Sequence, residues 1–530
     1  MSLWGPSTMI SHRLRRAAAL GAASLLAGAG LVGLAATPAF AVTVADETQL
    51  NTAITNEDAV IELTSDITLT ADISSITSPV TIVGNGFEID ANASDAFYID
   101  LNGTEAVSLS DVTIVDTDDA VYAELADTAT LTLTNVTVTG AAGDAFYIYA
   151  QDESSVVASG LTATEADYAF YFESASSADA TFSVTGSSFT NNSYGLYFYG
   201  YGTSSGTVTD TDMSANDNYG LYTDMYEDGM DLVVSRSTMN DNDDLGVYLC
   251  DMSGTLLIED STVDGNTYAG IDGYIYSEDG GQFTLSGSTV SNNGEGGIEL
   301  DASDEDATFT MINSTVSGND GDDYGSAAVE IDSDDYDGAG VFIRNSTITA
   351  NTAVWAGLYA SYIPVEISHS IISGNEVGAY ADVWDDSASD YDISWSIVDI
   401  NDEIVEGSGV EAAAYTEGDG VVFSTEPGLG ALADNGGPTL THLPLDDSLA
   451  LNTGNPDAEA GAMGVPDTDQ RGLARVSGTA IEIGAVEVQE EDELAATGAE
   501  AGLGVAGGLT LLTLGLGLVG IRLARRRQLA

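Results

Sequence analysis

The sequence of 530 residues has no lysine and a single cysteine, and both shortages narrow its functions. The lone cysteine, Cys250, excludes an intrachain disulfide, so packing must stabilise the fold. The chain carries 85 acidic residues against 11 arginines, which gives a formal net charge of −74. Such a surface repels polyanions, so binding of nucleic acid is a poor hypothesis.

Both ends of the chain have the composition of export signals. Arg13, Arg15 and Arg16 precede a small-residue apolar run, which predicts a signal peptide over residues 1–41. A second apolar run, residues 501–521, is long enough to span a bilayer, and its basic flank would remain in the cytoplasm. Between the two ends lie nearly all the acidic residues and only four arginines: Arg236, Arg344, Arg471 and Arg475.

One short phrase recurs through most of the chain, as in Leu109 to Ile114 and Ile343 to Ile348. It returns every 24–27 residues, apart from one 32-residue interval before Ile348. Each unit reads as short alternating strands separated by Gly, Asn, Asp and Ser, without helical periodicity. The sequence therefore predicts an all-β solenoid of about 12 coils.

Asparagine follows the repeated phrase by three residues in the later coils. Asparagine tolerates the left-handed conformation of a tight corner, and stacked amides can bond along a column. We therefore expect a stacked corner formed by these residues: Asn192, Asn216, Asn242, Asn266, Asn293, Asn319, Asn351, Asn375 and Asn401.

A period near 25 residues with three strands in each unit resembles the right-handed parallel β-helix superfamily of pectin-lyase-like proteins. The resemblance covers residues 84–402, and residues 42–83 are expected to form an N-terminal cap and the first irregular coils. It implies a scaffold but no reaction, because that scaffold hosts lyases, hydrolases, adhesins and inert stalks.

The repeat gives way to a different pattern over residues 403–491. Its short motifs include Asn435 to Pro438, Asn452 to Gly454 and Asp469 to Gly472. The order of these motifs resembles that in the choice-of-anchor Q domain. That resemblance implies a C-terminal capping module and no reaction. We expect structural roles for its histidine and arginines, with arginine joining loops through carboxylates and carbonyls: His442, Arg471 and Arg475.

Residues 492–530 resemble the cell-wall sorting signal of a sortase substrate. The motif is Leu494, Ala495, Ala496, Thr497 and Gly498, followed by the apolar run and the basic tail. Alanine stands where the commonest motif has proline, which changes the class of sortase implied. The resemblance implies cleavage after Thr497, with sortase and peptidoglycan as partners and covalent attachment to the cell wall. A permanent single-pass anchor is the alternative.

Seven tyrosines occupy the same position in successive coils. Strand alternation places the neighbouring aliphatic residues inside, so this column should point outward. Two interpretations remain open: a strip on which sugar rings stack, or cross-strand packing that stabilises the sheet. The residues are Tyr98, Tyr122, Tyr147, Tyr171, Tyr197, Tyr222 and Tyr248.

Carboxylates replace tyrosine in the next coils of this column. These are Asp272, Glu299 and Glu330, and the next outward position holds Asp301 and Asp332. Glu299, Asp301, Glu330 and Asp332 should share one patch, with Asp272 nearby. Hard oxygen ligands suit Ca²⁺, the one cofactor the sequence suggests. A retaining glycosidase pair and a solvated acidic face are the alternatives.

A pectin-lyase-like enzyme is a weaker hypothesis than a contact protein. The outward positions of the sheet before the asparagine corner are mostly Thr and Ser, no lysine is available as a base, and Arg344 is expected to pair with Glu366. We predict a wall-anchored, adhesin-like rod that contacts an extracellular carbohydrate or another surface polymer without catalysis. A polysaccharide lyase or glycoside hydrolase and an inert spacer remain as alternatives.

Overall fold

The computed structural model describes residues 40–489, apart from 227–228, 276–280, 303–306, 322–326, 334–339, 353–355, 377–382, 385–389, 400–413 and 463. The chain divides into two units, residues 1–40 and 41–530. Nearly all described residues belong to the second unit. The predicted signal peptide and the sorting residues 492–530 lie outside the described part.

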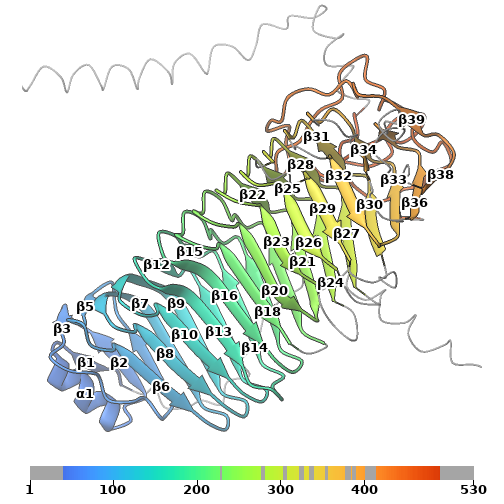
Figure 1. The fold of residues 1–530 in the computed structure, drawn as a ribbon. Coiled ribbons are helices and arrows are strands. Elements are labelled where there is room, and N and C mark those ends of the chain that lie inside the picture. Colours follow the sequence, from blue (N-terminus) through green and yellow to red (C-terminus); the bar gives the residue numbers. More distant parts are fainter. Residues whose placement is uncertain are drawn as a thin grey trace, which may run out of the picture. The chain divides into compact units, whose positions relative to one another are not determined.

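The second unit is a parallel β-solenoid in which successive coils add strands to three faces (Figure 1). The predicted all-β solenoid of about 12 coils is confirmed. Face 1 contains β1 (Val42–Val44), β2 (Val60–Leu63), β4 (Val80–Val83), the first parts of β7 (Ala106–Thr117) and β9 (Thr130–Ala141), β11 (Ser155–Ser159), β14 (Thr181–Thr185), β17 (Ser205–Thr209), β19 (Asp231–Ser235), β21 (Thr255–Glu259), β24 (Gln282–Ser286), β27 (Thr308–Ile312), β30 (Gly340–Arg344), β33 (Val365–Ser368), β36 (Asp390–Ser394) and β38 (Ala414–Glu417).

Face 2 begins where β7 and β9 turn a corner without a break in the strand. Its other strands are β3 (Ile67–Thr68), β5 (Glu88–Asp90), β12 (Thr162–Thr164), β15 (Ser188–Phe189), β22 (Thr262–Asp264), β25 (Thr289–Ser291), β28 (Thr315–Ser317), β31 (Thr347–Thr349), β34 (Ile371–Ile372), β37 (Ile397–Val398) and β39 (Val422–Phe423).

Face 3 is a separate sheet of 12 strands. It contains β6 (Phe97–Leu101), β8 (Val121–Leu125), β10 (Phe146–Ala150), β13 (Tyr168–Ser174), β16 (Tyr194–Gly200), β18 (Leu221–Met225), β20 (Val247–Met252), β23 (Ile271–Tyr274), β26 (Ile298–Asp301), β29 (Val329–Asp332), β32 (Leu358–Ser361) and β35 (Val383–Trp384).

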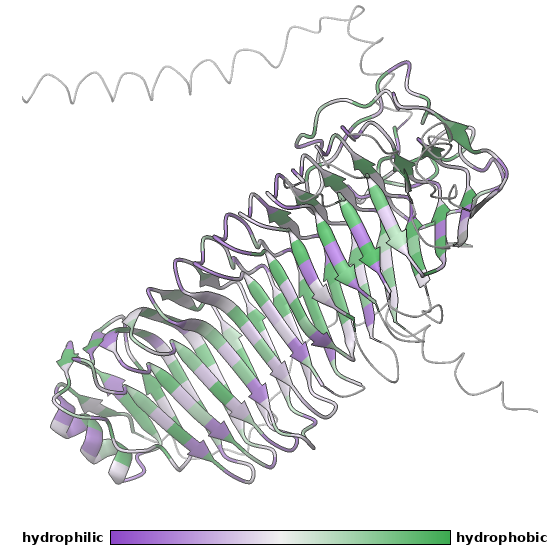
Figure 2. Ribbon diagram, viewed as in Figure 1, coloured by the Kyte–Doolittle hydropathy of each residue, from purple (hydrophilic) through white to green (hydrophobic). Residues whose placement is uncertain are grey.

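Strand alternation fills the interior of the coils. In β10, Phe146, Ile148 and Ala150 are buried while Tyr147 and Tyr149 are only partly covered. Figure 2 shows the same alternation as bands of apolar and polar residues along the strands. One continuous cluster of buried apolar residues runs through the solenoid, which supplies the stabilisation that disulfides cannot.

The asparagine column is an internal hydrogen-bond ladder. In each step one side-chain oxygen accepts from the amide and the side chain of the preceding ladder residue; Asn266 Oδ1 accepts from Asn242 N at 3.0 Å and from Asn242 Nδ2 at 2.9 Å. The ladder runs from Asn192 to Asn375, and the predicted Asn401 lies outside the described residues.

The expectation that these asparagines adopt the left-handed backbone conformation of the corner is wrong by one residue. The left-handed conformation belongs to the residue before each ladder asparagine, as at Asn191 (φ 58°), Ala215 (φ 56°) and Gly374 (φ 81°). The ladder side chain must point inward to reach the next coil, so the corner bends one position earlier.

A second ladder, which the repeat alone does not predict, is formed by the serines of the repeated motif. Ser261 Oγ accepts from Ser237 N at 3.1 Å, and Ser288 Oγ accepts from Ser261 N at 3.1 Å. The pattern continues to Ser396. Both ladders satisfy buried polar groups at the corners, where strand pairing is interrupted.

A short helix begins the solenoid. α1 (Glu47–Thr55) buries Leu50, Ala53 and Ile54 against the first coil, and Asp46 caps it by accepting from Gln49 N at 2.9 Å. The N-terminal cap is expected from the sequence, but its helix is not.

Residues 424–488 lie along the side of the later coils, against face 2. The Gln470 side chain donates to Thr289 Oγ1 at 2.9 Å and accepts from Thr315 Oγ1 at 2.6 Å, while His442 Nε2 lies 2.8 Å from Ser317 Oγ. This cover explains why the outward hydroxyls of β25 and β28 are buried. Among the described residues, the structure has no helix that could cross a bilayer.

Candidate functional site

The outward surface of face 3 carries the predicted tyrosine column. Each tyrosine pairs in register with the next, from Tyr98 with Tyr122 to Tyr222 with Tyr248. The predicted register is therefore confirmed for all seven residues. The arrangement of the rings then determines which parts of the tyrosines a ligand could contact.

The rings stack on one another rather than lying flat on the surface. Five consecutive pairs are nearly parallel, with centroids 5.3, 4.8, 4.9, 4.8 and 3.9 Å apart and interplanar angles of 7° to 19°. The last pair, Tyr222 and Tyr248, is tilted by 54°. This is the cross-strand packing interpretation, and it leaves ring edges and hydroxyl groups for contact with a partner.

Carboxylates beside the column hold two of the hydroxyls. Tyr98 Oη donates to Glu124 at 3.0 Å and Tyr147 Oη donates to Glu173 at 2.7 Å. The bond to Glu124, with some burial, raises the pKa of Tyr98 to about 12. These hydroxyls keep their protons at any physiological pH, so the surface is neutral at the tyrosines and negative at the adjacent carboxylates.

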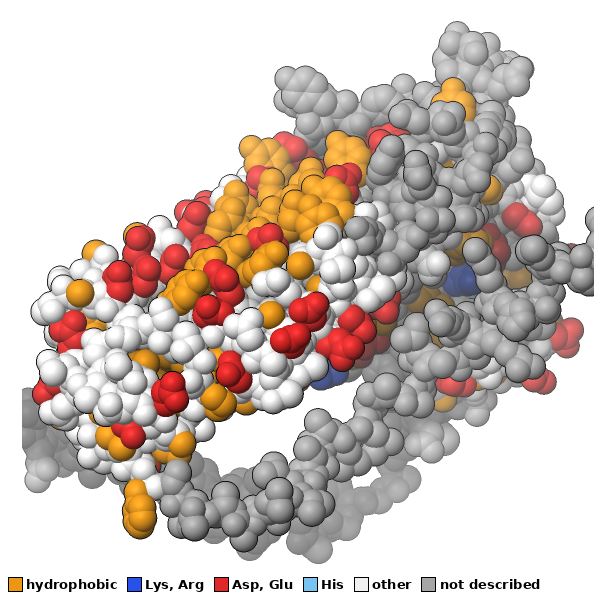
Figure 3. All heavy atoms as spheres, turned by 90° about the horizontal axis from the view of Figure 1, so that it is seen from below, with side chains coloured by type: hydrophobic (Ala, Val, Ile, Leu, Met, Phe, Trp, Pro, Cys, Tyr) orange, Lys and Arg blue, Asp and Glu red, His pale blue; other side chains and the backbone are white. Residues whose placement is uncertain are grey.

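Further tyrosines widen the column on both sides. Tyr168 stacks on Tyr194 with centroids 4.7 Å apart and meets Tyr171 edge-on. On the other side, Tyr201 stacks on Tyr226 at 5.0 Å. Figure 3 shows hydrophobic side chains, a class that includes tyrosine and is coloured orange, gathered over several coils. Acidic side chains, in red, lie beside them.

The five predicted acidic residues continue the same sheet. Asp272 pairs with Glu299, Glu299 with Glu330, and Asp301 with Asp332, so the five residues lie in register on adjacent coils. In the described part of the chain, three candidate metal ligands come within 4.8 Å of one another only elsewhere, at β18 and β20. The Ca²⁺ and catalytic interpretations of the patch therefore stay predictions.

Burial perturbs the titration of this patch. It raises the pKa of Asp272 to about 6 and that of Glu330 to about 7, although Glu330 also accepts from Ala327 N at 3.1 Å. Burial and then the charge of Asp272 raise the pKa of Glu299 to about 7. Glu299 is the most exposed of the three, so solvent weakens its shift most.

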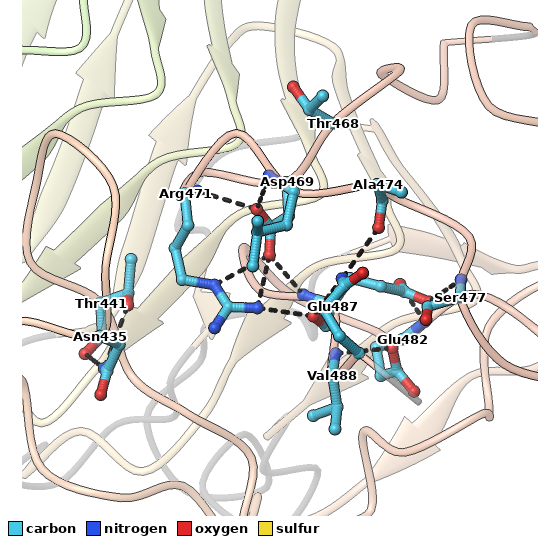
Figure 4. Close-up of polar contacts among 12 residues, drawn as sticks. Asn435, Thr441, Thr468, Asp469, Arg471, Ala474, Ser477, Glu482, Glu487 and Val488 are labelled. Atoms are coloured by element: carbon cyan, nitrogen blue, oxygen red, sulfur yellow. Dashed lines mark hydrogen bonds and ion pairs between the residues drawn. The ribbon is translucent and has the colours of Figure 1, made fainter. Parts of the chain in front are cut away.

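The histidine and arginines of the C-terminal segment have structural contacts, and Figure 4 shows those of Arg471. Arg471 pairs with the buried Asp469 at 2.9 Å and donates to Glu487 O at 2.6 Å. Arg475 is fully buried and donates to Gly484 O at 2.9 Å and to Asn313 Oδ1. These bonds join the segment to itself and to face 1, as arginine forks commonly do.

Face 1 offers a shallow hollow and one ion pair. Small outward side chains of β11, β14 and β17 leave an open depression of about 400 Å³ lined by Val157, Ser183 and Thr207. Arg344 pairs with Glu366 at 3.0 Å, as expected from their adjacent coils. The hollow is apolar with hydroxyl edges, and within it the described residues include a single carboxylate, Asp231.

Two protein families match parts of the chain. Residues 121–274 match the right-handed β-helix region, which agrees with the predicted fold. Residues 41–143 match a family described as a putative pectate lyase-like adhesive domain. No curated protein matches the chain.

Several solved structures are similar in fold. The periplasmic alginate epimerase AlgG is 12% identical with a TM-score of 0.41, covering 72% of this chain and 85% of that one. The Azotobacter vinelandii mannuronan C-5 epimerase AlgE4 A-module is 15% identical with a TM-score of 0.37, covering 63% and 92%. Pectate lyase Pel9A is 12% identical with a TM-score of 0.33, covering 84% and 96%. Similarity this low carries no inference about activity.

Proposed function

We propose that this chain is an exported surface protein whose face 3 contacts a neutral extracellular polysaccharide without transforming it. The observation that carries the proposal is the in-register tyrosine column, with its hydroxyl groups and ring edges directed outward. A solenoid repeats the same contact at every coil, which suits a polymer that repeats along its own length. The adhesive-domain family match supports contact as the role.

Charge selects the class of polymer. The net charge of −74 opposes approach of uronate, sulfated or phosphate polymers unless cations bridge them. A neutral polysaccharide offers many hydroxyls that can bond to tyrosine hydroxyls and to the carboxylates beside them. We therefore favour a neutral glycan over the anionic substrates of lyases and epimerases.

The test is an array of neutral and anionic polysaccharides probed with the full chain. Binding to neutral members and intact chains after prolonged incubation would support the contact role. Unsaturated products or new reducing ends would instead establish the rival carbohydrate-active enzyme. Absence of binding to any member would leave the inert spacer.

Wall attachment is the second part of the proposal. It is supported by the sequence of residues 492–530, with Thr497 as the residue joined to peptidoglycan and residues 403–491 as the module that precedes it. In a sortase-bearing Gram-positive host, muramidase digestion should release chains that end at Thr497 linked to a cell-wall peptide. Release by detergent alone, with residues 498–530 still present, would favour the permanent membrane anchor.

A further inference from the structure

A β-bulge interrupts face 3 at the only cysteine. Thr223 pairs with Leu249 and Met225 pairs with Met252, so one residue of β18 lies opposite two residues of β20. The single residue is Asp224 and the two are Cys250 and Asp251. Bulges re-aim side chains, and they are frequent beside functional sites.

The bulge brings three potential metal ligands together. A carboxylate oxygen of Asp224, the Cys250 sulfur and a carboxylate oxygen of Asp251 lie within 4.8 Å of one another. In the described part of the chain, no other group of three such ligands is this close. The cluster lies outside the five-carboxylate patch.

Asp224 supplies an independent sign that a ligand is missing. Its side chain is 2% exposed, and its Oδ1 atom has no hydrogen-bond partner. A buried carboxylate oxygen without a partner is costly, since such atoms are normally paired, hydrogen-bonded or bound to a metal. A bound cation would supply the missing partner.

The donor set selects the type of metal. Ca²⁺ and Mg²⁺ take oxygen ligands, so a cysteine sulfur argues against both. One sulfur and two carboxylate oxygens suit Zn²⁺, which accepts both kinds of ligand and leaves a fourth position to water in three-ligand sites.

We propose that Asp224, Cys250 and Asp251 bind one Zn²⁺ ion. Because Zn²⁺ bonds are about 2.0–2.3 Å long, the ligand atoms of a bound ion lie no more than about 4 Å apart, and small side-chain rotations would bring the three to that spacing. Asp251 and Cys250 are only partly buried, so they have room to rotate. The Tyr222 side chain lies beside the Cys250 sulfur, where it can orient the thiolate.

The site would lie within the tyrosine surface. Tyr199 and Tyr226 meet edge-on at 5.5 Å beside Asp224, and Tyr201 stacks on Tyr226. Zinc would offset most of the negative charge of its two carboxylates and thiolate, and it would fix the two strands at the bulge. Zinc binding does not depend on the proposed polysaccharide contact, so either can fail alone.

Absorption spectroscopy with Co²⁺ tests the site directly. The full chain, prepared without a histidine tag, is titrated with Co²⁺ and then with Zn²⁺. A thiolate-to-cobalt charge-transfer band should appear and disappear as Zn²⁺ displaces Co²⁺. Because the chain has one cysteine, such a band can come only from Cys250.

Matched variants separate the ligands from general acidity. Cys250→Ser should abolish the band, Asp224→Asn should weaken Zn²⁺ binding by at least about tenfold, and Asp231→Asn, an exposed carboxylate on face 1, should change neither. Zinc should also raise the Tm of the wild-type chain but not of Cys250→Ser.

If a variant fails to fold, the Co²⁺ titration of the wild-type chain still tests the proposal. Absence of the band, or Zn²⁺ affinity that is unchanged in Asp224→Asn, would overturn it.

Discussion

At a single position of the coil, repetition joins side chains from successive coils into a column. Asn266 accepts two bonds from Asn242 and donates to Asn293 Oδ1 at 2.8 Å and to Met239 O at 3.0 Å. Each ladder asparagine thus forms hydrogen bonds with the coil before its own and with the coil after it.

Replacing one ladder asparagine should therefore destabilise several coils. Asn266→Ala leaves buried donors and acceptors without partners, and we expect a loss of about 2–4 kcal/mol in unfolding free energy. Urea unfolding followed by circular dichroism measures it. Asn218→Ala is the matched control, because Asn218 is only half-buried and its side chain makes a single bond, to Ser193 O at 3.2 Å. Equal losses in the two variants would contradict the ladder's role.

Residue registers that follow the repeat could be predicted from the sequence. The tyrosine, asparagine and carboxylate columns need only a constant period. The bulge at Cys250 could not be predicted, because one extra residue in a strand is decided by packing against neighbouring coils. The left-handed residues differ in type, as with Asn191 and Ala215, so composition alone does not reveal them.

Among the elements, the non-repeating ends depart most from expectation. α1 is missed because one short helix has no partner in the repeat. The signal was Asp46 followed three residues later by Gln49, which is the spacing of a capping box; the Gln49 side chain accepts from the N–H of Ala45, one residue before the cap, at 3.1 Å. The position of residues 424–488 along face 2 could not be predicted, because its contacts join residues more than a hundred positions apart.

Gln470 is central to that contact. Its side chain donates to Ser288 O, Thr289 Oγ1 and Thr439 Oγ1, and it accepts from Thr315 Oγ1. Gln470→Ala should therefore loosen the C-terminal segment from face 2 while the coils stay folded.

Hydrogen exchange should show faster exchange in residues 427–488 of this variant and unchanged exchange in face 3. Gln489→Ala, whose bonds stay within the segment, is the control. If Gln470→Ala exchanges like the wild-type chain, the segment is held by other contacts.

For the whole molecule, the dependence of stability on pH follows from carboxylates whose pKa values are raised by burial. Burial raises the pKa of Asp272 to about 6 and that of Glu330 to about 7, so the folded chain keeps protons that the unfolded chain releases above about pH 4. Stability should fall as pH rises from about 4 to 7.

Thermal unfolding at a series of pH values measures this trend. The Tm should be higher near pH 5 than near pH 8, and the double variant Asp272→Asn with Glu330→Gln should have a flatter profile. A Tm that rises with pH would show that the carboxylates are compensated, for example by bound cations.

At the scale of the whole molecule, the solenoid is proposed to contact a polymer through the tyrosine column of face 3. Tyr122→Phe with Tyr171→Phe keeps the stacked rings and removes two hydroxyls, while Tyr362→Phe removes the hydroxyl of an exposed tyrosine outside the column. The decisive measurement is the Kd of these chains for the neutral polysaccharide that the array selects. The account predicts a Kd about tenfold higher for the column variant and unchanged for the control. Equal affinities in all three chains would contradict it.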